Sequence, residues 1–197
     1  KINVAIASWP WPNLFGQGKR EQGVRLQMAT YKRPSPETAP CHSKAAGLYM
    51  ICTISKHQAE REGFDDALML DTRGFVAETN ATHVFIVRNS DKSRASGDLA
   101  TSRVVSCPEG ITRATVIEIC AAEKIRCVEA DLSVVDVYGA NEMFCTGTMG
   151  ELAAEGTVQR CTRVGISVRP PAYGPWSTSI LTCDPANALA RSATTPR

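Results

Sequence analysis

The stretch that decides the fold spans residues 43–77 and reads SKAAGLYMICTISKHQAEREGFDDALMLDTRGFVA. Its first part carries apolar or small residues at three- and four-residue spacing, which is the period of one helix face. These residues are Leu48, Ile51, Cys52, Ser55 and Ala59. The spacing predicts a helix from Ser43 to about Glu62, and Gly63 follows as a stop signal.

The second part of the same stretch predicts a hairpin. Residues 67–70 are a short apolar run, 71–74 have the composition of a turn, and 75–77 resume as a strand. Further elements are expected as strands at 4–7, 24–31, 84–87, 125–128 and 142–148, and as helices at 116–120 and 133–138. Thr112 is a candidate N-cap for the first of these helices. Hairpins and helices around one core indicate an α+β (mixed α/β) domain.

The composition is ordinary for a globular protein. The chain has 197 residues, of which 43% are hydrophobic, and a formal net charge of +2. That length can bury a sizeable core. The near-neutral charge points to no nucleic acid and no anionic membrane surface as a partner. No run of about 18 apolar residues is present, so no membrane span is expected.

The cysteines favour a structural interpretation over a metal site. They stand at 41, 52, 107, 120, 127, 145, 161 and 183, with no CxxC pair and no Cys/His ligand spacing. We therefore expect no zinc or other metal site. Several lie in apolar runs, which is typical of buried free thiols in a reducing compartment. A cytoplasmic location is the corresponding expectation.

Lys44 is the first candidate for chemistry. It is followed by two alanines, a glycine and an apolar run, a poor setting for a solvated charge. A lysine amine in apolar surroundings loses basicity, because burial disfavours the ammonium form. Such an amine can form a Schiff base with a carbonyl cofactor such as pyridoxal phosphate. The alternative is a lysine that extends to solvent from the flank of a helix.

Two segments have the character of anion sites. Gly110, Ile111 and Thr112 open a helix, whose first backbone N–H groups and partial positive charge suit a phosphate. Residues 146–150 follow a strand, and their glycines would let backbone amides approach a ligand. Ordinary helix capping and an ordinary turn after a strand are the alternatives.

Glu78 offers the acid that a pyridine ring would require. A carboxylate beside a pyridine nitrogen keeps that nitrogen protonated, and the protonated ring can accept electrons released from a substrate C–H bond. The alternative for Glu78 is a solvent-facing residue at a strand end. His83 alternates with apolar neighbours and is interpreted as a hydrogen-bonded structural residue. Arg33 and Glu151 are likewise interpreted as structural or solvated.

Taken in this order, the segments resemble the fold-type IV pyridoxal-phosphate aminotransferases, and most closely the branched-chain amino acid aminotransferases. The resemblance covers residues 1–153 well and extends more loosely to about Leu181. The matching motifs are 32–36, 44–49, 66–71, 74–78, 110–113 and 146–148. The resemblance implies the large C-terminal domain of the D-amino acid aminotransferase-like fold. It divides the chain into 1–40, the interdomain segment and start of the large domain; 41–181, the cofactor-binding large domain; and 182–197, a mobile tail.

The resemblance also implies roles for individual residues around the cofactor ring. Lys44 matches the Schiff-base lysine, which would also move the proton between the substrate carbon and the cofactor. Tyr49 matches the tyrosine that hydrogen-bonds the cofactor's phenolic oxygen. Glu78 matches the carboxylate on the pyridine nitrogen.

Further implied roles concern the phosphate and the substrate. The segments that match phosphate ligands contain Gly110, Ile111, Thr112 and Thr148. The backbone amides of Thr148 and Met149 would face the substrate carboxylate, and Trp11 aligns with an apolar wall of the substrate pocket.

The implied activity is transamination of a branched-chain L-amino acid with 2-oxoglutarate through the Lys44 Schiff base, in a homo-oligomer that is a dimer or larger. A D-amino acid aminotransferase, an aminodeoxychorismate lyase and a non-catalytic truncated fragment or cofactor-binding module stay open as alternatives. This sequence departs from the family in several places, among them Leu14, where some members carry a pocket tyrosine, and the segment after Met149, where the expected pattern is blurred. Members normally carry a small N-terminal domain ahead of the segment that matches residue 1. Residues 79–83 replace a Gly-rich stretch that commonly ends in Asn, and they end in His83.

Overall fold

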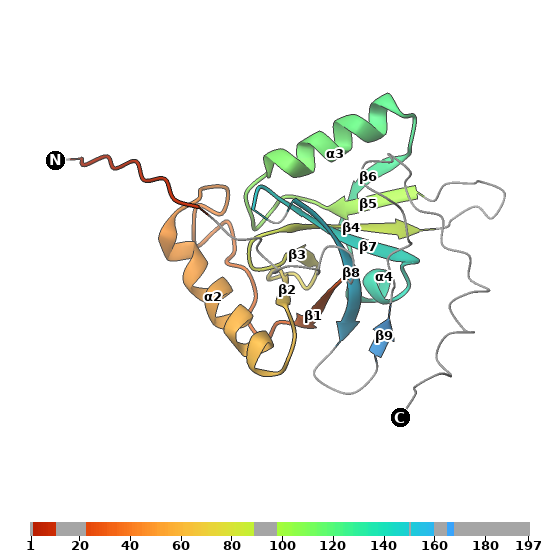
Figure 1. Cartoon of the computed structure of the whole chain (residues 1–197), viewed down its shortest axis with the longest axis horizontal. Helices are drawn as coiled ribbons and strands as arrows, with labels where there is room; N and C mark the ends of the chain where they lie inside the picture. Colours follow the sequence, from red (N-terminus) through yellow and green to blue (C-terminus); the bar gives the residue numbers. More distant parts are fainter. Residues whose placement is uncertain (1, 11–22, 89–97, 150, 160–164, 168–197) are drawn as a thin grey trace.

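A mixed sheet forms the centre of the protein in the computed structural model (Figure 1). The structure describes residues 2–10, 23–88, 98–149, 151–159 and 165–167, the last two ranges by their backbone alone. Within these residues, nine strands pair in the order β3-β2-β1-β8-β7-β4-β5-β6, with β9 paired to β8. None of the helices in this part of the chain has the length and apolarity needed to cross a membrane.

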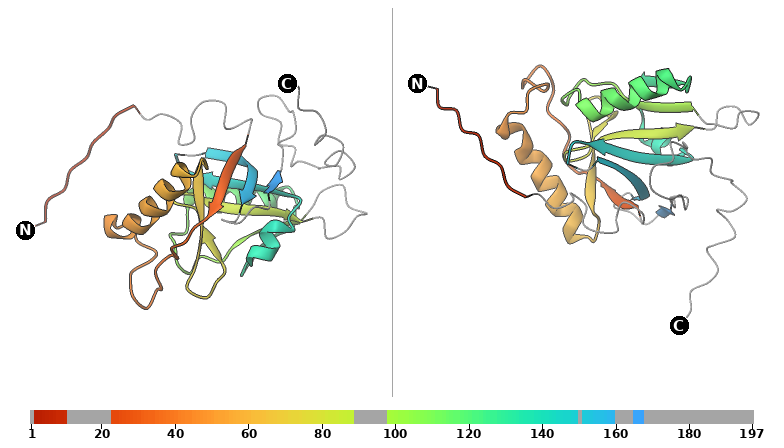
Figure 2. Two further views of the ribbon diagram at one scale, coloured as in Figure 1. Left: turned by 90° about the horizontal axis from the view of Figure 1, so that it is seen from below. Right: turned by 45° about the horizontal axis from the view of Figure 1, so that its top comes forward.

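The strands and helices alternate irregularly along the chain. The strands are β1 Val24–Met28, β2 Asp66–Leu70, β3 Val76–Glu78, β4 His83–Arg88, β5 Asp98–Ser102, β6 Cys127–Ala130, β7 Glu142–Gly147, β8 Glu151–Gln159 and β9 Gly165–Ser167. The helices are α2 Ala46–Arg61, α3 Ile111–Ala122 and α4 Val134–Tyr138. Helix α2 lies beside β2, and α3 runs over β6 and β7 (Figures 1 and 2). The predicted mixture of helices and strands around one core is confirmed.

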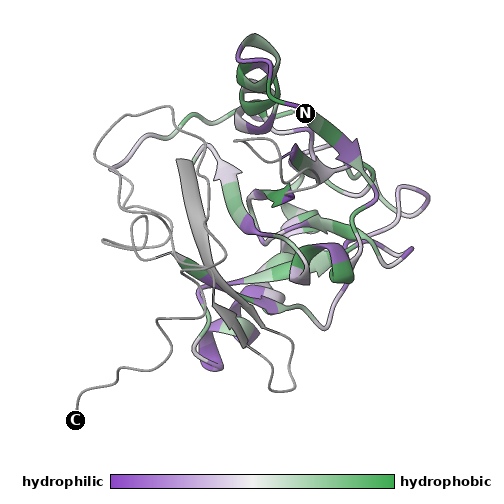
Figure 3. Ribbon diagram, turned by 90° about the vertical axis from the view of Figure 1, so that its right-hand side faces the viewer, coloured by the Kyte–Doolittle hydropathy of each residue, from purple (hydrophilic) through white to green (hydrophobic). Residues whose placement is uncertain are grey.

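Apolar side chains on both faces of the sheet hold the helices in place. Val84 and Ile86 of β4 enter one cluster of buried side chains, together with residues of β1, β2, β3, β5, α4 and β7. Phe85, on the opposite face of β4, packs in a second cluster with Val116 of α3. Its ring stacks on that of Phe144, with centroids 5.1 Å apart. This alternation is expected, because successive side chains of a strand point to opposite faces. Hydrophobic residues, green in Figure 3, accordingly run along the strands and helices.

The predicted helix and hairpin of residues 43–77 are both confirmed. Helix α2 buries Leu48, Cys52, Ser55 and Ala59, four of the five positions that the spacing selected, and Ile51 is half-buried. It ends before Gly63, which adopts a φ of 85° that a glycine tolerates easily. Strands β2 and β3 pair antiparallel and bring Met69 opposite Glu78. Glu78 therefore occupies the last position of a strand whose three residues are all buried.

The turn of this hairpin is fixed by Asp71. Its carboxylate accepts hydrogen bonds from the backbone N–H groups of Arg73 and Phe75, at 2.9 and 3.0 Å. Gly74 supplies the positive φ of 95° that the turn requires. The turn sets the register of β3 and hence the position of Glu78.

Other predictions about the elements were wrong. Residues 2–10 form no strand, and Ile2, Val4 and Ile6 are 93, 85 and 96% exposed. Apolar alternation alone does not form a strand, because the backbone N–H and C=O groups need a partner strand. Strand β9 was not predicted, and neither were β5 and β8. Strands β5 and β8 both carry small and polar residues. Strand β5 pairs with β4 and β6, and β8 pairs with β1 and β7. These neighbours determine the conformation of both strands.

Candidate active site

A buried carboxylate lies at the end of β3. Glu78 is 5% exposed, so its interpretation as a solvent-facing residue is wrong. Its Oε1 is 3.1 Å from a guanidinium nitrogen of Arg33. Burial raises the pKa of Glu78 to about 7, and the positive charges of Arg33 and Lys44 oppose that rise. A carboxyl group with this pKa can hold or release a proton near neutral pH.

Arg33 fixes the position of this carboxylate. It is 1% exposed and follows β1 in the connection to α2. Its Nε donates to the carbonyl of Ser106 at 3.1 Å, and another guanidinium nitrogen contacts the thiol of Cys52. Burial tends to lower the pKa of Arg33, but Glu78 and Cys52 raise it overall. Arg33 thus joins β3, α2 and the loop before α3, a role that its sequence neighbours did not indicate.

The Lys44 amine lies within electrostatic reach of Glu78. Its charge lowers the pKa values of Glu78 and His83, although burial dominates the pKa of both. Its Nζ donates a hydrogen bond to the Tyr49 hydroxyl at 3.4 Å. Lys44 is exposed, so the predicted apolar surroundings are wrong. The small residues that follow it are exposed as well, and Leu48 is the first buried residue of α2.

Helix α3 begins without a side-chain cap. Gly110 holds the N-cap position with φ 78° and ψ 113°, and as a glycine it offers no side chain to accept a hydrogen bond from the helix end. The prediction of Thr112 as N-cap is wrong, because α3 already begins at Ile111. The first N–H groups of a helix have no partner within it. Since Ile111 is 83% exposed, this helix end faces outward and can receive an anion.

His83 connects α3 with the end of β3. It is 7% exposed, and burial, followed by the charge of Arg113, lowers its pKa to about 4. The imidazole donates to the carbonyl of Pro108. A Cβ added at Gly110 would lie 2.5 Å from the ring, so only glycine fits there. His83 is therefore a buried, hydrogen-bonded residue, as the sequence predicted.

The loop after β7 reaches the same end of the sheet. Thr146 pairs with His83 in the β4–β7 ladder. Two residues later, Thr148 and Met149 form an exposed turn, and Met149 is 46% exposed. The Oγ1 of Thr146 is buried and has no hydrogen-bond partner among the residues that the structure describes. Trp11, Gly150 and the tail 182–197 lie outside the described residues.

The structure thus brings together three groups with distinct chemistry. They are an exposed amine beside a phenol, a buried carboxylate held by Arg33, and an uncapped helix end. An aldehyde cofactor needs an amine nucleophile, and its ring nitrogen needs an acid partner. Its phosphate needs hydrogen bonds from backbone N–H groups. The donor set therefore fits pyridoxal phosphate.

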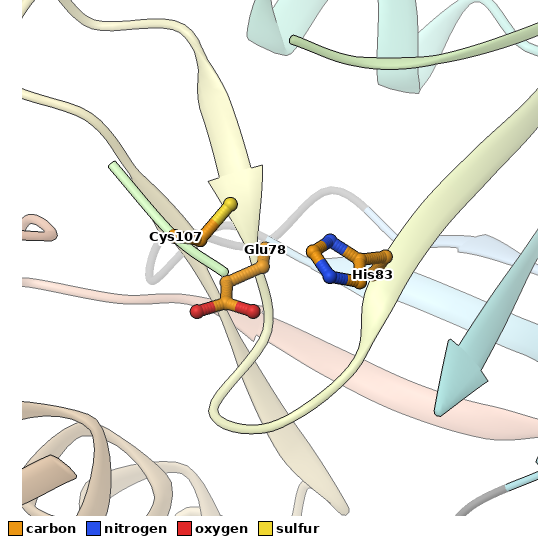
Figure 4. Close-up of side chains that lie close together, drawn as sticks. All are labelled: Glu78, His83 and Cys107. Carbon is orange, nitrogen blue, oxygen red and sulfur yellow. The ribbon is translucent and has the colours of Figure 1, made fainter. Parts of the chain in front are cut away.

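A further cluster involves Glu78, His83 and Cys107. One donor atom from each lies within 4.8 Å of the others, and all three residues are buried. Figure 4 shows the imidazole facing the other two side chains. Burial and, to a lesser extent, the charge of Glu78 raise the pKa of Cys107 to about 12. Cys107 is one of the buried thiols that the sequence predicted, together with Cys41, Cys52, Cys120 and Cys145.

Comparison with known proteins gives consistent matches. The family model for amino-transferase class IV matches residues 1–154. The branched-chain-amino-acid aminotransferase of Pseudomonas aeruginosa is 31% identical over 152 residues, which are 77% of this chain and 47% of that protein. The crystal structure of the Escherichia coli branched-chain amino acid aminotransferase matches with a TM-score of 0.74 and 29% sequence identity. The match covers 85% of this chain and 51% of the Escherichia coli chain.

One of the matching crystal structures contains a cofactor. It is an aminotransferase from Brucella abortus bound to the co-factor PLP, with a TM-score of 0.63 and 31% identity. The match covers 69% of this chain and 46% of that one. This chain spans about half the length of the curated relatives that it matches.

Proposed function

Because the chain belongs to the amino-transferase class IV family, we propose that it binds pyridoxal phosphate and transfers the amino group of a branched-chain L-amino acid to 2-oxoglutarate. The observation that carries the proposal is the buried Glu78–Arg33 pair within electrostatic reach of the Lys44 amine. The similarity to branched-chain aminotransferases supports the choice of substrate. The homo-oligomer that the resemblance implies stays a prediction, as do the domain boundaries.

Three residues of this chain have separate roles around the cofactor ring. Lys44 would hold the cofactor covalently through Nζ and would take the proton from the substrate α-carbon. The Tyr49 hydroxyl lies 3.4 Å from that amine and positions it. Tyr49 would also contact the cofactor's phenolic oxygen, and Glu78 would keep the ring nitrogen protonated. Bound pyridoxal phosphate supplies the aldehyde that accepts the amino group and the ring that accepts electrons from the substrate.

Backbone N–H groups are proposed to bind the cofactor phosphate and the substrate carboxylate. The N–H groups of Ile111 and Thr112 would hold the phosphate, since the N-cap residue of α3 supplies no side-chain cap. Thr148 is proposed as a further phosphate ligand, and the amides of Thr148 and Met149 as donors to the substrate carboxylate. Trp11 is proposed as part of the apolar wall beside the substrate side chain.

A comparison of amino donors tests this function. The full chain, supplied with pyridoxal phosphate and 2-oxoglutarate, is expected to form glutamate from L-leucine faster than from D-alanine. Preference for D-alanine, or release of 4-aminobenzoate from aminodeoxychorismate, would favour the corresponding relative instead. Binding of pyridoxal phosphate without turnover of any of the three compounds would identify a non-catalytic binding module.

Replacing Ile111 with proline tests the phosphate contact alone. Proline is tolerated at the first position of a helix but has no N–H, so this substitution removes one donor. A hydrogen bond to a charged group contributes about 1.5–3 kcal/mol, so the Kd for pyridoxal phosphate should rise about tenfold or more. Fluorescence titration measures the change. Ile111→Ala is the matched control, because it keeps the N–H and Ile111 is 83% exposed. Equal affinity of both variants would rule out this phosphate contact.

A further inference from the structure

Three residues from different parts of the fold bring together side chains of the kinds that bind metal ions. Their spacing in the sequence did not predict this. Glu78 ends β3, His83 begins β4, and Cys107 lies in the loop before α3. They are 5, 7 and 0% exposed, and their donor atoms lie within 4.8 Å of one another. We propose that this cluster binds a borderline-soft divalent cation of the Zn²⁺ type, and that the bound ion excludes pyridoxal phosphate by occupying Glu78.

The chemistry of the donors selects the class of ion. One carboxylate oxygen, one imidazole nitrogen and one sulfur form a mixed set that suits Zn²⁺, whereas Mg²⁺ and Ca²⁺ prefer oxygen ligands. Three protein ligands with a fourth position open to water is a common arrangement for Zn²⁺. Bonds of about 2.0–2.3 Å place tetrahedral donors about 3.3–3.8 Å apart. Because the donors now lie up to 4.8 Å apart, their separations must shorten by up to about 1–1.5 Å.

Contacts around the cluster orient two of the ligands. His83 donates one ring N–H to the carbonyl of Pro108, which leaves its other nitrogen as an acceptor. Arg33 contacts Oε1 of Glu78, which leaves the second oxygen for an ion. Such outer contacts are typical of metal sites, because they fix the tautomer and the orientation of the ligands. His83 occupies the position at which the resembling family commonly has Asn. This chain therefore carries a strong metal ligand at that position.

The thiol changes state when the ion binds. Cys107 now donates weakly to the carbonyl of Ala77, with sulfur and oxygen 3.9 Å apart. Binding breaks the S–H bond, forms a bond between sulfur and the ion, and releases one proton to the solvent. No electron is transferred, because Zn²⁺ has no redox chemistry. The nearby charges of Arg33 and Arg113 oppose a dication, so we expect weaker binding than at a structural zinc site.

Competition with the cofactor follows from the shared ligand. Under the proposed function, Glu78 faces the ring nitrogen, and one carboxylate cannot serve both partners while Arg33 holds its other oxygen. Zn²⁺ binding itself does not depend on the proposed function; only the competition rests on it.

Titration of the full chain with ZnCl₂ after chelator treatment tests the site directly. One equivalent should bind, and Co²⁺ in its place should show a thiolate-to-metal charge-transfer band. His83→Asn and Cys107→Ser should each weaken Zn²⁺ binding about tenfold or more, the scale of disrupting a metal site. His57→Asn and Cys127→Ser are matched controls outside the cluster and should bind as the wild type does. The circular dichroism spectrum of each variant verifies folding.

The results separate the site from the cofactor. Absence of the Co²⁺ thiolate band in the wild type, or undiminished Zn²⁺ affinity in folded His83→Asn and Cys107→Ser, overturns the site. Zn²⁺ should also raise the Kd for pyridoxal phosphate in the wild type but not in Cys107→Ser, which excludes chelation of free cofactor as the cause. An equal effect in both proteins overturns the competition. Failure of pyridoxal phosphate to bind at all contradicts the proposed function and leaves the Zn²⁺ titration as an independent result.

Discussion

Replacing Lys44 with arginine is expected to abolish covalent labelling of the chain by pyridoxal phosphate and borohydride. A guanidinium cannot take the place of the primary amine, because arginine stays protonated in proteins. Transamination should fall by about 10³-fold or more in kcat, since loss of a positioned acid–base group alone costs about 10²–10⁴-fold. Mass spectrometry of the reduced, digested protein locates the label, and steady-state assays give kcat.

The control for this substitution is Lys56→Arg in helix α2, which begins two residues after Lys44. Lys56 forms an i,i+4 ion pair with Glu60 at 3.8 Å, which arginine can keep. Because Lys44 is exposed, its replacement should change the free energy of unfolding by less than about 0.5 kcal/mol. A label that maps to another lysine, or one that persists in Lys44→Arg, would show that Lys44 does not hold the cofactor.

Replacing Arg33 with methionine is expected to destabilise the protein by about 3 kcal/mol at pH 8. The substitution leaves the Glu78 carboxylate buried without its partner, and breaking a buried ion pair costs about 3–5 kcal/mol. It also removes the donor to the Ser106 carbonyl. Chemical denaturation followed by circular dichroism measures the loss. Arg73→Met is the control, because Arg73 pairs with Asp71 from a side chain that is 45% exposed.

This destabilisation should depend on pH in a defined direction. Glu78 has a folded-state pKa of about 7, above the value of about 4.3 for an unfolded chain. The stability that this group contributes is thus fully present below the unfolded value and is lost as the pH rises through 7. At pH 5 the carboxyl group is already largely neutral, so removal of Arg33 should cost less than at pH 8. An equal cost at both pH values would contradict the ionic role of Arg33.

Much of the fold could be predicted because its signals are local. The period of Leu48, Cys52, Ser55 and Ala59 specifies one buried helix face within a few turns. The turn after β2 depends on Asp71 and Gly74, which lie three residues apart. The failures came where pairing partners are distant in sequence. Strand β8 lies between β1 and β7, and nothing within its own residues predicted that place.

For the site, too, the sequence predicted what depends on local motifs and missed what depends on contacts between distant segments. Lys44, Tyr49, Glu78 and the start of α3 belong to short motifs, so the sequence by itself determined which residues carry the proposed chemistry. Burial and charge pairing depend on contacts between segments far apart, such as Arg33 with Ser106, 73 positions away. Only the tertiary structure therefore decided that Lys44 is exposed, that Arg33 holds Glu78, and that His83 and Cys107 lie beside it. The physical reason is that desolvation and Coulomb energy depend on distance in space, which sequence spacing does not report.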